Sequence, residues 1–489
     1  MAKRSSGILL PVYALPSRNG CGTLGKECYN FIEWMALAKQ SIWEVLPIGP
    51  TGESHSPYQS YSSFAGNPLF IDIDLLRDEG LLSEDEINAY CYGYDAEKVD
   101  YELSLPSREK LLRLAFQRGR DDINFLVFKR NNAYWLKDYA LYTALHDYFN
   151  DKPWNEWPDD GLRKYSTLAI EKYSDAFKPE TEYYSFLQFK FYQQWEEALN
   201  FAHSKGVKIF GEINAFPALD SSDVWAHQDL FLLDVEKQPE EYYAVPATNY
   251  RASGKILPAV PFDWRRLKKD GYLWWVKCLE FNFSHFDFIK IRNFASFDKY
   301  FSVSAQYSDA NYGKWHSGPG EDFVKTVLTW FGLEKFIAVG DENEVFASDL
   351  AETFGLSKMR NLQAAFKKIG SNPNLPHSLD RNCVLYTSGI QDYSLKTFEG
   401  KAPKLESDYA KLYCQGLLGE DLPWAMIRTA LASVADIVII PMQDVLGLDE
   451  KSATIQPHSK DSFRWRFYPP HLTAGMTKRL ADYTKLYDR

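Results

Sequence analysis

The sequence predicts an α/β fold, namely a (β/α)8 TIM barrel with a large helical insertion and additional loop insertions. Short apolar runs recur at wide spacing along the chain, and helical patterns fill the intervals between them. Such runs are typical of parallel strands that are covered on both faces, and their alternation with helices favours a barrel. The candidate strands are residues 41–46, 207–213, 288–293, 336–340, 383–387 and 437–441.

The predicted insertion spans approximately residues 76–199, where helical patterns are frequent and strand patterns are rare. Apolar residues follow helical spacing in residues 107–118, 132–150 and 182–205, and Gly206 is a candidate C-cap for the last of these helices. No repeat, low-complexity tract or Pro/Ser linker divides the chain. We therefore interpret residues 1–489 as a single elaborated barrel domain with a mainly helical insertion.

The composition restricts the kinds of binding partner and the cellular compartment that we expect for this protein. The formal net charge of −11 argues against a nucleic acid or an anionic membrane as partner, because both favour basic patches. No stretch reaches the length of about 20 apolar residues that a membrane span needs. Pro11 interrupts the short apolar run near the N-terminus, so no signal peptide is expected. The six cysteines form no C-x-x-C pair, which indicates reduced thiols and a cytoplasmic protein.

The nine histidines are scattered, and no pair of them has the spacing of a metal site. We therefore expect no bound metal and no cofactor. The sequence names no protein partner.

Several longer motifs follow one another along nearly the whole chain. The most specific is Ser-Pro-Tyr-Gln-Ser-Tyr-Ser-Ser-Phe-Ala-Gly-Asn-Pro at residues 56–68. The others are residues 43–51, 220–226, 262–264, 372–377, 442–449 and 464–466. In this order they resemble the 4-α-glucanotransferases (amylomaltase, disproportionating enzyme, glycoside hydrolase family 77). The resemblance implies a TIM barrel and a role in the metabolism of an α-glucan, namely glycogen or maltodextrin.

Retaining transfer of α-1,4-glucan segments, the activity of that family, requires two carboxylates about 5–5.5 Å apart across the scissile bond. One attacks the anomeric carbon, while the other protonates the leaving oxygen and then deprotonates the acceptor. A third carboxylate in the family holds sugar hydroxyls. Barrel enzymes carry such groups at the C-terminal ends of their strands.

At each of the three positions where the family has a carboxylate, this chain has a residue without one. The family's nucleophile strand usually reads Val-Arg-Ile-Asp-His-Phe-Arg-Gly-Phe, and residues 289–297 read Ile-Lys-Ile-Arg-Asn-Phe-Ala-Ser-Phe. Lys290 therefore replaces the Arg, and Arg292 replaces the nucleophilic Asp. Val339, or Gly340 if the gap is placed otherwise, aligns with the acid/base Glu, and Gln391 aligns with the third Asp. We expect none of these residues to be catalytic, because a protonated guanidinium has no usable lone pair with which to form a glycosyl ester.

The resemblance also implies residues that contact a sugar. Tyr58 and Gln59 belong to the motif at residues 56–68, and Tyr250 keeps an aromatic ring near a family Phe. His377 belongs to the motif at residues 372–377. These four are the candidate substrate-binding residues, with α-glucan or maltooligosaccharide as the expected ligand. Alternatively, residues 56–68 form a structural loop that holds the first barrel strand to its neighbours.

The leading interpretation is a 4-α-glucanotransferase-like protein that is inactive or severely impaired and acts by glucan binding or regulation. One alternative is an active transferase that uses displaced carboxylates, for which Asp341, Glu342 and Asp392 are the candidates. A shift of even one residue moves a carboxylate by several ångströms, so we favour solvated or helix-capping roles for these three.

A second alternative is a binder of an anionic ligand centred on Lys290 and Arg292. A buried charge needs a partner, however, so an ion pair between Arg292 and one of the three loop carboxylates is the simpler expectation. Glu212, near the end of its predicted strand, is interpreted as a hydrogen-bonding core carboxylate at the barrel mouth.

Overall fold

The barrel consists of eight parallel strands in the order β10-β11-β12-β1-β2-β3-β6-β9. The computed structural model describes residues 4–247, 254–338, 349–367, 369–370, 372–414, 419–455 and 461–489. The two end strands, β9 and β10, approach within 8 Å between Cα atoms, so the sheet curls into a barrel and the predicted fold class is confirmed. The strands are β1 (Ser5–Leu9), β2 (Ile42–Glu44), β3 (Lys208–Asn214), β6 (Phe288–Arg292), β9 (Phe336–Ala338), β10 (Lys358–Asn361), β11 (Cys383–Tyr386) and β12 (Ile437–Pro441).

All six predicted strands overlap barrel strands, but β1 and β10 were not predicted. β10 reads Lys-Met-Arg-Asn and has no apolar run, because only part of it faces the core. β1 is apolar over three residues and contains Gly7, whose hydrogen lets β2 approach closely. A Cβ on Gly7 would lie 2.2 Å from the carbonyl oxygen of Ile42.

Apolar side chains from neighbouring strands fill the lower part of the barrel. Alternate residues of a strand face the same side, so each strand sends every second side chain inward. The enclosed cluster contains Leu9, Ile42, Phe210, Val384, Tyr386 and Ile439, with Phe288 and Met359 packed against it. Two residues further along β2, β3 and β6, the same face carries Glu44, Glu212 and Lys290. A charged layer therefore lies directly above the apolar layer, toward the C-terminal ends of the strands.

Helices cover the outside of the barrel and connect its strands. They are α1 (Lys26–Leu37), α10 (Ser222–Ala226), α11 (Trp264–Lys269), α12 (Leu273–His285), α13 (Gly320–Phe331), α14 (Leu350–Thr353), α15 (Leu395–Lys401), α16 (Lys404–Cys414), α17 (Leu422–Ala432), α18 (Met442–Leu446) and α19 (Ala474–Leu486). Within the described residues, none of the helices has the length and apolarity that a membrane crossing requires. The chain ends lie close together, and Arg489 Nη1 donates to the Ser5 carbonyl oxygen at 3.1 Å.

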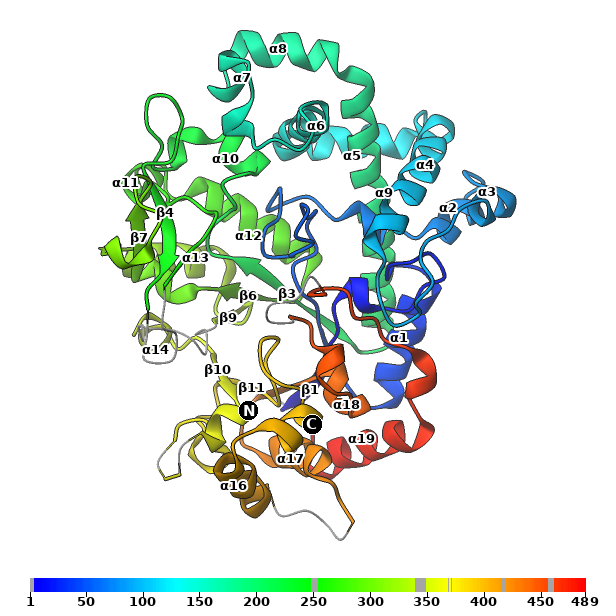
Figure 1. Ribbon diagram of the computed structural model, residues 1–489, viewed down its shortest axis with the longest axis vertical. Helices are drawn as coiled ribbons and strands as arrows, with labels where there is room; N and C mark the ends of the chain where they lie inside the picture. Colours follow the sequence, from blue (N-terminus) through cyan, green and yellow to red (C-terminus); the bar gives the residue numbers. More distant parts are fainter. Residues whose placement is uncertain are drawn as a thin grey trace.

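Residues between β2 and β3 form a set of helices, and none of the described residues there forms a strand. The helices are α2 (Ile73–Asp78), α3 (Glu84–Asn88), α4 (Tyr101–Gly119), α5 (Ile123–Asn131), α6 (Ala133–Tyr148), α7 (Asp160–Arg163), α8 (Thr167–Ala176) and α9 (Lys178–Ser204). In Figure 1, α7 and α8 lie farthest from the barrel, and the long α9 returns beside α1. α9 ends where Gly206 adopts a φ of 74°, a left-handed conformation that suits glycine.

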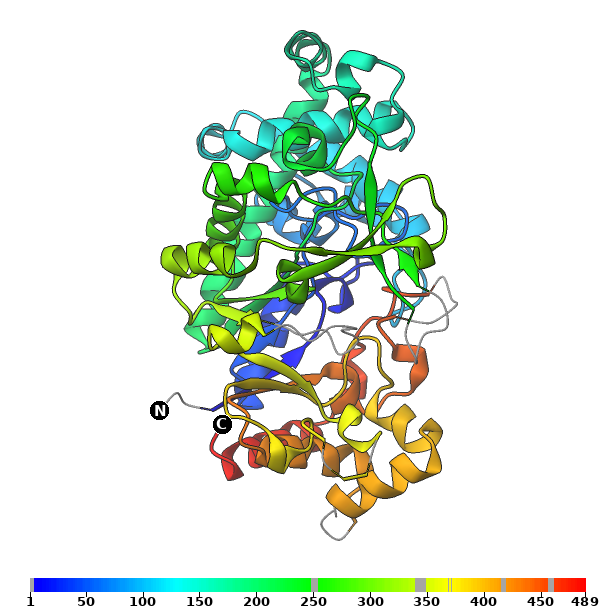
Figure 2. The same cartoon turned by 90° about the vertical axis from the view of Figure 1, so that its left-hand side faces the viewer.

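A second, antiparallel sheet has the order β5-β4-β7-β8 and was not predicted as strands. Its strands are β4 (Glu241–Val245), β5 (Lys255–Ile256), β7 (Lys299–Ser304) and β8 (Lys314–Ser317). The helices between β2 and β3, the barrel and the C-terminal helices follow one another along the long axis of the molecule (Figure 2). β4 and β7 lie on one side of the barrel mouth, where they contribute to the wall of a cleft described below.

The motif at residues 56–68 is fixed to α9. Gln188 accepts from the Gly66 amide at 2.7 Å and donates to the Gly66 carbonyl oxygen at 2.9 Å. The Tyr192 hydroxyl donates to the Phe64 carbonyl oxygen. A Cβ on Gly66 would lie 2.0 Å from the Phe191 ring, so only glycine fits at this contact. The helices between β2 and β3 thus determine where this motif lies.

We predict that Gly66→Ala destabilises the fold by about 1–3 kcal/mol, because the added methyl group forces Phe191 or the loop to move. Urea denaturation of the purified variant measures this change. Gly400→Ala is the matched control, since a Cβ there meets no atom within 4 Å and alanine favours the helix. Equal free energies of unfolding for the two variants would contradict the proposed contact.

Candidate functional site

A cleft of about 550 Å³ opens at the C-terminal ends of β3 and β6. Four residues that the sequence predicts for the site line it together: Tyr58, Gln59, Arg292 and Gln391. Asn214 and Asn293, the residues that end β3 and follow β6, add polar groups. The wall beside the antiparallel sheet carries aromatic rings, namely Phe216, Tyr243, Tyr300, Phe301 and Trp315. The cleft therefore combines aromatic faces with convergent polar groups.

The floor of the cleft is a buried ion network. Lys290 lies opposite Glu212 in the register of β3 and β6, and both side chains point into the barrel. Lys290 Nζ lies 2.8 Å from Glu44 Oε1 and 3.2 Å from Glu212 Oε2. The Tyr386 hydroxyl also donates to Glu44 Oε1, at 3.0 Å. One ammonium group thus pairs with two carboxylates that are almost completely removed from solvent.

Arg292 extends this network to the cleft surface. It is two residues beyond Lys290 on the same face of β6, and its Nη1 lies 3.5 Å from Glu212 Oε1. Its guanidinium stacks on the Tyr58 ring, with 4.1 Å between Cζ and the ring centroid. The Tyr58 hydroxyl lies 3.5 Å from Glu212 Oε2. Glu212, a carboxylate that the sequence analysis placed in the core, is therefore one ion-pair partner of Arg292.

Burial shifts the protonation equilibria of this network. It raises the pKa of Glu44, and the charge of Lys290 partly opposes that shift. For Lys290, burial lowers the pKa, but the charges of Glu212 and Glu44 outweigh it, so the pKa of Lys290 is raised. Burial and the charge of Glu212 raise the pKa of the Tyr58 hydroxyl well above its usual value. Lys290 consequently stays charged at neutral pH, and Tyr58 stays neutral.

Asp392 is held inside its own loop. One of its carboxylate oxygens accepts from the Gly389 amide at 2.9 Å and from the Asn361 side chain. The same loop is fixed by Asp444, which accepts from the hydroxyls of Thr387 at 2.7 Å and Ser388 at 2.6 Å. Burial raises the pKa of Asp444 to about 6. Among the described residues, Gln391 lines the cleft, whereas Asp392 is used to shape the loop.

Of the remaining predicted site residues, four are not described, and His377 is away from the residues that line the cleft. Val339, Asp341, Glu342 and Tyr250 lie outside the described residues. His377 is exposed, and its Nδ1 lies 2.8 Å from the hydroxyl of Tyr413 on α16. His377 is not among the described residues that line the cleft.

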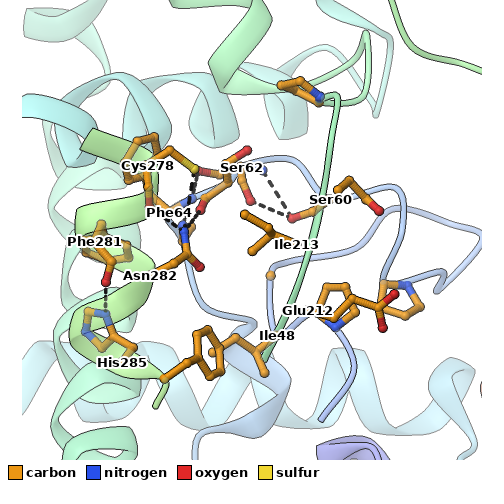
Figure 3. Close-up of a pocket in the computed structure, with 18 of the residues that line it drawn as sticks. Ile48, Ser60, Ser62, Phe64, Glu212, Ile213, Cys278, Phe281, Asn282 and His285 are labelled. Atoms are coloured by element: carbon orange, nitrogen blue, oxygen red, sulfur yellow. Dashed lines mark hydrogen bonds between the residues drawn. The ribbon is translucent and has the colours of Figure 1, made fainter. Parts of the chain in front are cut away.

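A small cavity of about 60 Å³ lies behind the cleft, between β3, α12 and the motif at residues 56–68 (Figure 3). Glu212 and Ile213 of β3 border it on one side, and Asn282 and His285 of α12 border it on the other. Asn282 Nδ2 donates to the Cys278 carbonyl oxygen at 2.8 Å, and burial lowers the pKa of His285 to about 4. Two neutral polar side chains of α12, Asn282 and His285, therefore lie on the other side of this cavity from β3. Within the described part of the chain, no cluster of three His, Cys, Asp or Glu residues could hold a metal ion.

A model of the family described as 4-alpha-glucanotransferase matches residues 10–471. This chain belongs to the 4-alpha-glucanotransferase family. It is 33% identical to a 4-alpha-glucanotransferase of Streptococcus pneumoniae over 100% of this chain and 98% of that protein. It is 34% identical to a 4-alpha-glucanotransferase of Clostridium butyricum over 98% of this chain and 99% of that protein.

Solved structures agree with this membership. The amylomaltase of Streptococcus agalactiae in complex with acarbose superimposes with a TM-score of 0.95 at 28% identity, and each chain is covered to 100%. The amylomaltase of Corynebacterium glutamicum has the same fold, with a TM-score of 0.78 at 13% identity over 98% of this chain and 75% of that one. Membership of the 4-alpha-glucanotransferase family thus agrees with the barrel fold.

Sequence reasoning missed Glu44 and Trp315. Glu44 lies in the apolar run Ile-Trp-Glu-Val-Leu, and a single charge inside such a run is a signal that a partner charge must face it. Trp315 lies on β8, whose polar sequence Lys-Trp-His-Ser gave no strand signal, so nothing local placed it at the cleft.

We predict that Lys290→Met destabilises the protein by about 3–5 kcal/mol, because it leaves Glu44 buried without a cation and removes one of the two cations that pair with Glu212. Adding Glu44→Gln and Glu212→Gln should recover part of the loss. Lys325→Met is the control, since its pair with Glu321 is exposed on α13 and is worth about 1 kcal/mol or less. Denaturant unfolding measures all of these variants, and a similar cost for Lys290→Met and Lys325→Met would refute the role of the network.

Proposed function

We propose that this chain binds α-glucan or maltooligosaccharide in the cleft and transfers glucan segments very slowly or not at all. The observation that carries the proposal is Arg292, which ends β6 at the cleft, where the family resemblance places the nucleophile. Its guanidinium pairs with Glu212 and stacks on Tyr58. A cation held in this way repels the developing positive charge of an oxocarbenium-like transition state.

The two carboxylates of the buried ion network do not supply a substitute pair. Glu44 and Glu212 both bind Lys290, and they lie below the cleft surface with almost no exposure. A carboxylate that must attack an anomeric carbon needs access to it and an unshared lone pair. We therefore assign Glu44 and Glu212 a structural role.

The alternatives have weaker support. For displaced carboxylates, Asp392 is the described candidate, and its hydrogen bonds to Gly389 and Asn361 restrain it. For an anionic ligand, Lys290 would have to leave Glu44 and Glu212 before it could bind an anion. Neither step is favoured by the observed contacts.

Glucan binding is supported by the lining of the cleft. Aromatic faces stack on the apolar faces of sugar rings, and Gln59, Asn214 and Gln391 offer amides to hydroxyl groups. The related Streptococcus agalactiae amylomaltase forms a complex with acarbose, and we infer a similar ligand class here. A binding or regulatory role in glycogen or maltodextrin metabolism follows.

A cytoplasmic location stays a prediction, as does the interpretation of residues 76–199 as an insertion within one barrel domain of residues 1–489.

We predict that purified protein incubated with maltotriose releases no glucose and forms no longer maltodextrins by chromatography, even at high protein concentration. Loss of a nucleophile from a catalytic unit lowers rates by about 10⁴–10⁶, which supports this expectation. A ladder of maltodextrins that Asp392→Asn abolishes would show instead that a displaced carboxylate is active.

We predict that Gln59→Ala weakens maltotriose binding by up to about tenfold, because one hydrogen-bonding amide is removed from the cleft. Titration calorimetry measures the dissociation constant. Gln306→Ala is the matched control, since Gln306 is exposed and is not among the described residues that line the cleft. Unchanged affinity in Gln59→Ala would remove this residue from the proposed binding site.

A further inference from the structure

A buried histidine at the end of α6 lies between two carboxylates. His146 belongs to the last turn of α6, and its side chain is 3% exposed. Its Nε2 lies 3.0 Å from Asp220 Oδ2, and its Nδ1 lies 3.2 Å from Asp151 Oδ1. An ionised carboxylate only accepts hydrogen bonds, so an imidazole that donates to both must carry a proton on each nitrogen. The geometry therefore selects the imidazolium form of His146.

The turn that follows α6 brings Asp151 back onto this ring. Asn150 and Asp151 both adopt left-handed backbone conformations, with φ values of 56° and 59°. The Asp151 amide donates to the His146 carbonyl oxygen at 3.0 Å, which closes the turn. Asn and Asp adopt such conformations more readily than most residues, and the C-terminal end of a helix favours a cation. The end of α6 is thus suited to a charged histidine.

The other titratable side chains near His146 come from α6 and from the motif at residues 56–68. The Tyr61 and Tyr142 rings lie 4.9 Å and 5.5 Å from the His146 ring, measured between centroids. Burial raises the pKa of both hydroxyls, so both tyrosines stay neutral near neutral pH. Asp147, the next residue on α6, accepts from the Tyr184 hydroxyl. As the pH rises, it is therefore the loss of the His146 proton that breaks the bridge between the two carboxylates.

The bridge shifts the protonation equilibrium of His146. Burial lowers the pKa of His146, but the hydrogen bond and charge of Asp220, together with Asp151, outweigh it, so the pKa is raised. An unfolded histidine has a pKa of about 6.5. The stabilisation that the bridge supplies is therefore fully present below about pH 6.5 and is lost as the pH rises through the raised pKa of the folded protein.

Asp220 connects the bridge to the motif at residues 56–68. Two residues beyond Asp220, Ser222 donates to the Tyr61 carbonyl oxygen from its amide and from its hydroxyl, each at 2.9 Å. Asp223 Oδ2 then accepts from the Ser63 amide at 2.6 Å. The segment that begins at Asp220 thus fixes the backbone of the motif, and the motif contributes side chains to the cleft.

We propose that His146 is a pH-sensitive link between α6 and the motif at residues 56–68. In its charged form it bridges Asp151 and Asp220, which holds the segment before α10 in place. Loss of its proton removes one donor and the positive charge, so the bridge opens and the motif is held less firmly. A consequence for glucan affinity rests on the proposed function, whereas the link itself does not.

The first test is urea unfolding of the full-length protein without ligand, at about pH 6 and about pH 8.5. Compared at equal pH, His146→Gln should be less stable than the wild type at the lower pH and should match it at the higher pH, where the wild-type ring is neutral. His146→Lys keeps a cation at both pH values and should stay stable at both. His377→Gln is the matched control, since His377 is exposed and bonds to a neutral hydroxyl, and it should follow the wild type.

Hydrogen exchange followed by mass spectrometry tests the connection to the motif. Peptides covering residues 56–68 should exchange about threefold or more faster in the wild type than in His146→Lys at about pH 8.5, and at equal rates at about pH 6. Comparison at equal pH cancels intrinsic exchange rates and every titration that the two proteins share.

Two results would overturn the proposal. One is an equal stability advantage of the wild type over His146→Gln at both pH values, which would show a permanently charged ion pair. The other is equal exchange of residues 56–68 in the wild type and His146→Lys at the higher pH. If His146→Lys fails to fold, the comparison with His146→Gln still decides. Both tests are made without glucan, so they remain valid if the cleft binds none.

Discussion

Two buried carboxylates, Glu44 and Glu212, have to be neutralised inside the barrel. The packing of β2, β3 and β6 and of the cleft above them depends on this neutralisation. Two cations of β6 provide it: Lys290, with both carboxylates within 3.2 Å of its ammonium group, and Arg292, which pairs with Glu212. Unpaired charges at this depth would cost several kcal/mol each, so the strands that carry them must keep their register. The network is therefore a constraint on β2, β3 and β6 together.

The same ion network is connected to the cleft and to helix α9. Arg292 shares Glu212 with Lys290 and lies against Tyr58, which belongs to the motif at residues 56–68. That motif is held by Gln188 and Tyr192 of α9. Helix α9, the motif and the cleft floor thus form one continuous set of contacts. The positive group at the end of β6, Arg292, is part of these contacts. Because it occupies the position expected for the nucleophile, we interpret the site as one for binding.

The sequence predicts the fold class well because six barrel strands are apolar runs that are covered on both faces. It fails for β10, whose Lys-Met-Arg-Asn run carries no hydrophobic pattern, and for the antiparallel strands, which are short and half exposed. Tyr58, Gln59, Arg292 and Gln391 are found from motifs, and the structure places them in one cleft. The pairing of Arg292 with Glu212 depends on strand register, and His377 lies elsewhere because its motif packs on α16. Neither fact is encoded locally.

The most direct test of the account is the reaction of the purified protein with α-maltosyl fluoride, followed by fluoride release and by intact-protein mass spectrometry. Fluoride leaves without help from a general acid, so this reagent isolates the nucleophile. The account predicts no fluoride release above the spontaneous rate and no maltosyl adduct, because Arg292 stands where the nucleophile is expected. Rapid fluoride release with a covalent maltosyl-enzyme would contradict it and would show that a carboxylate still attacks the anomeric carbon.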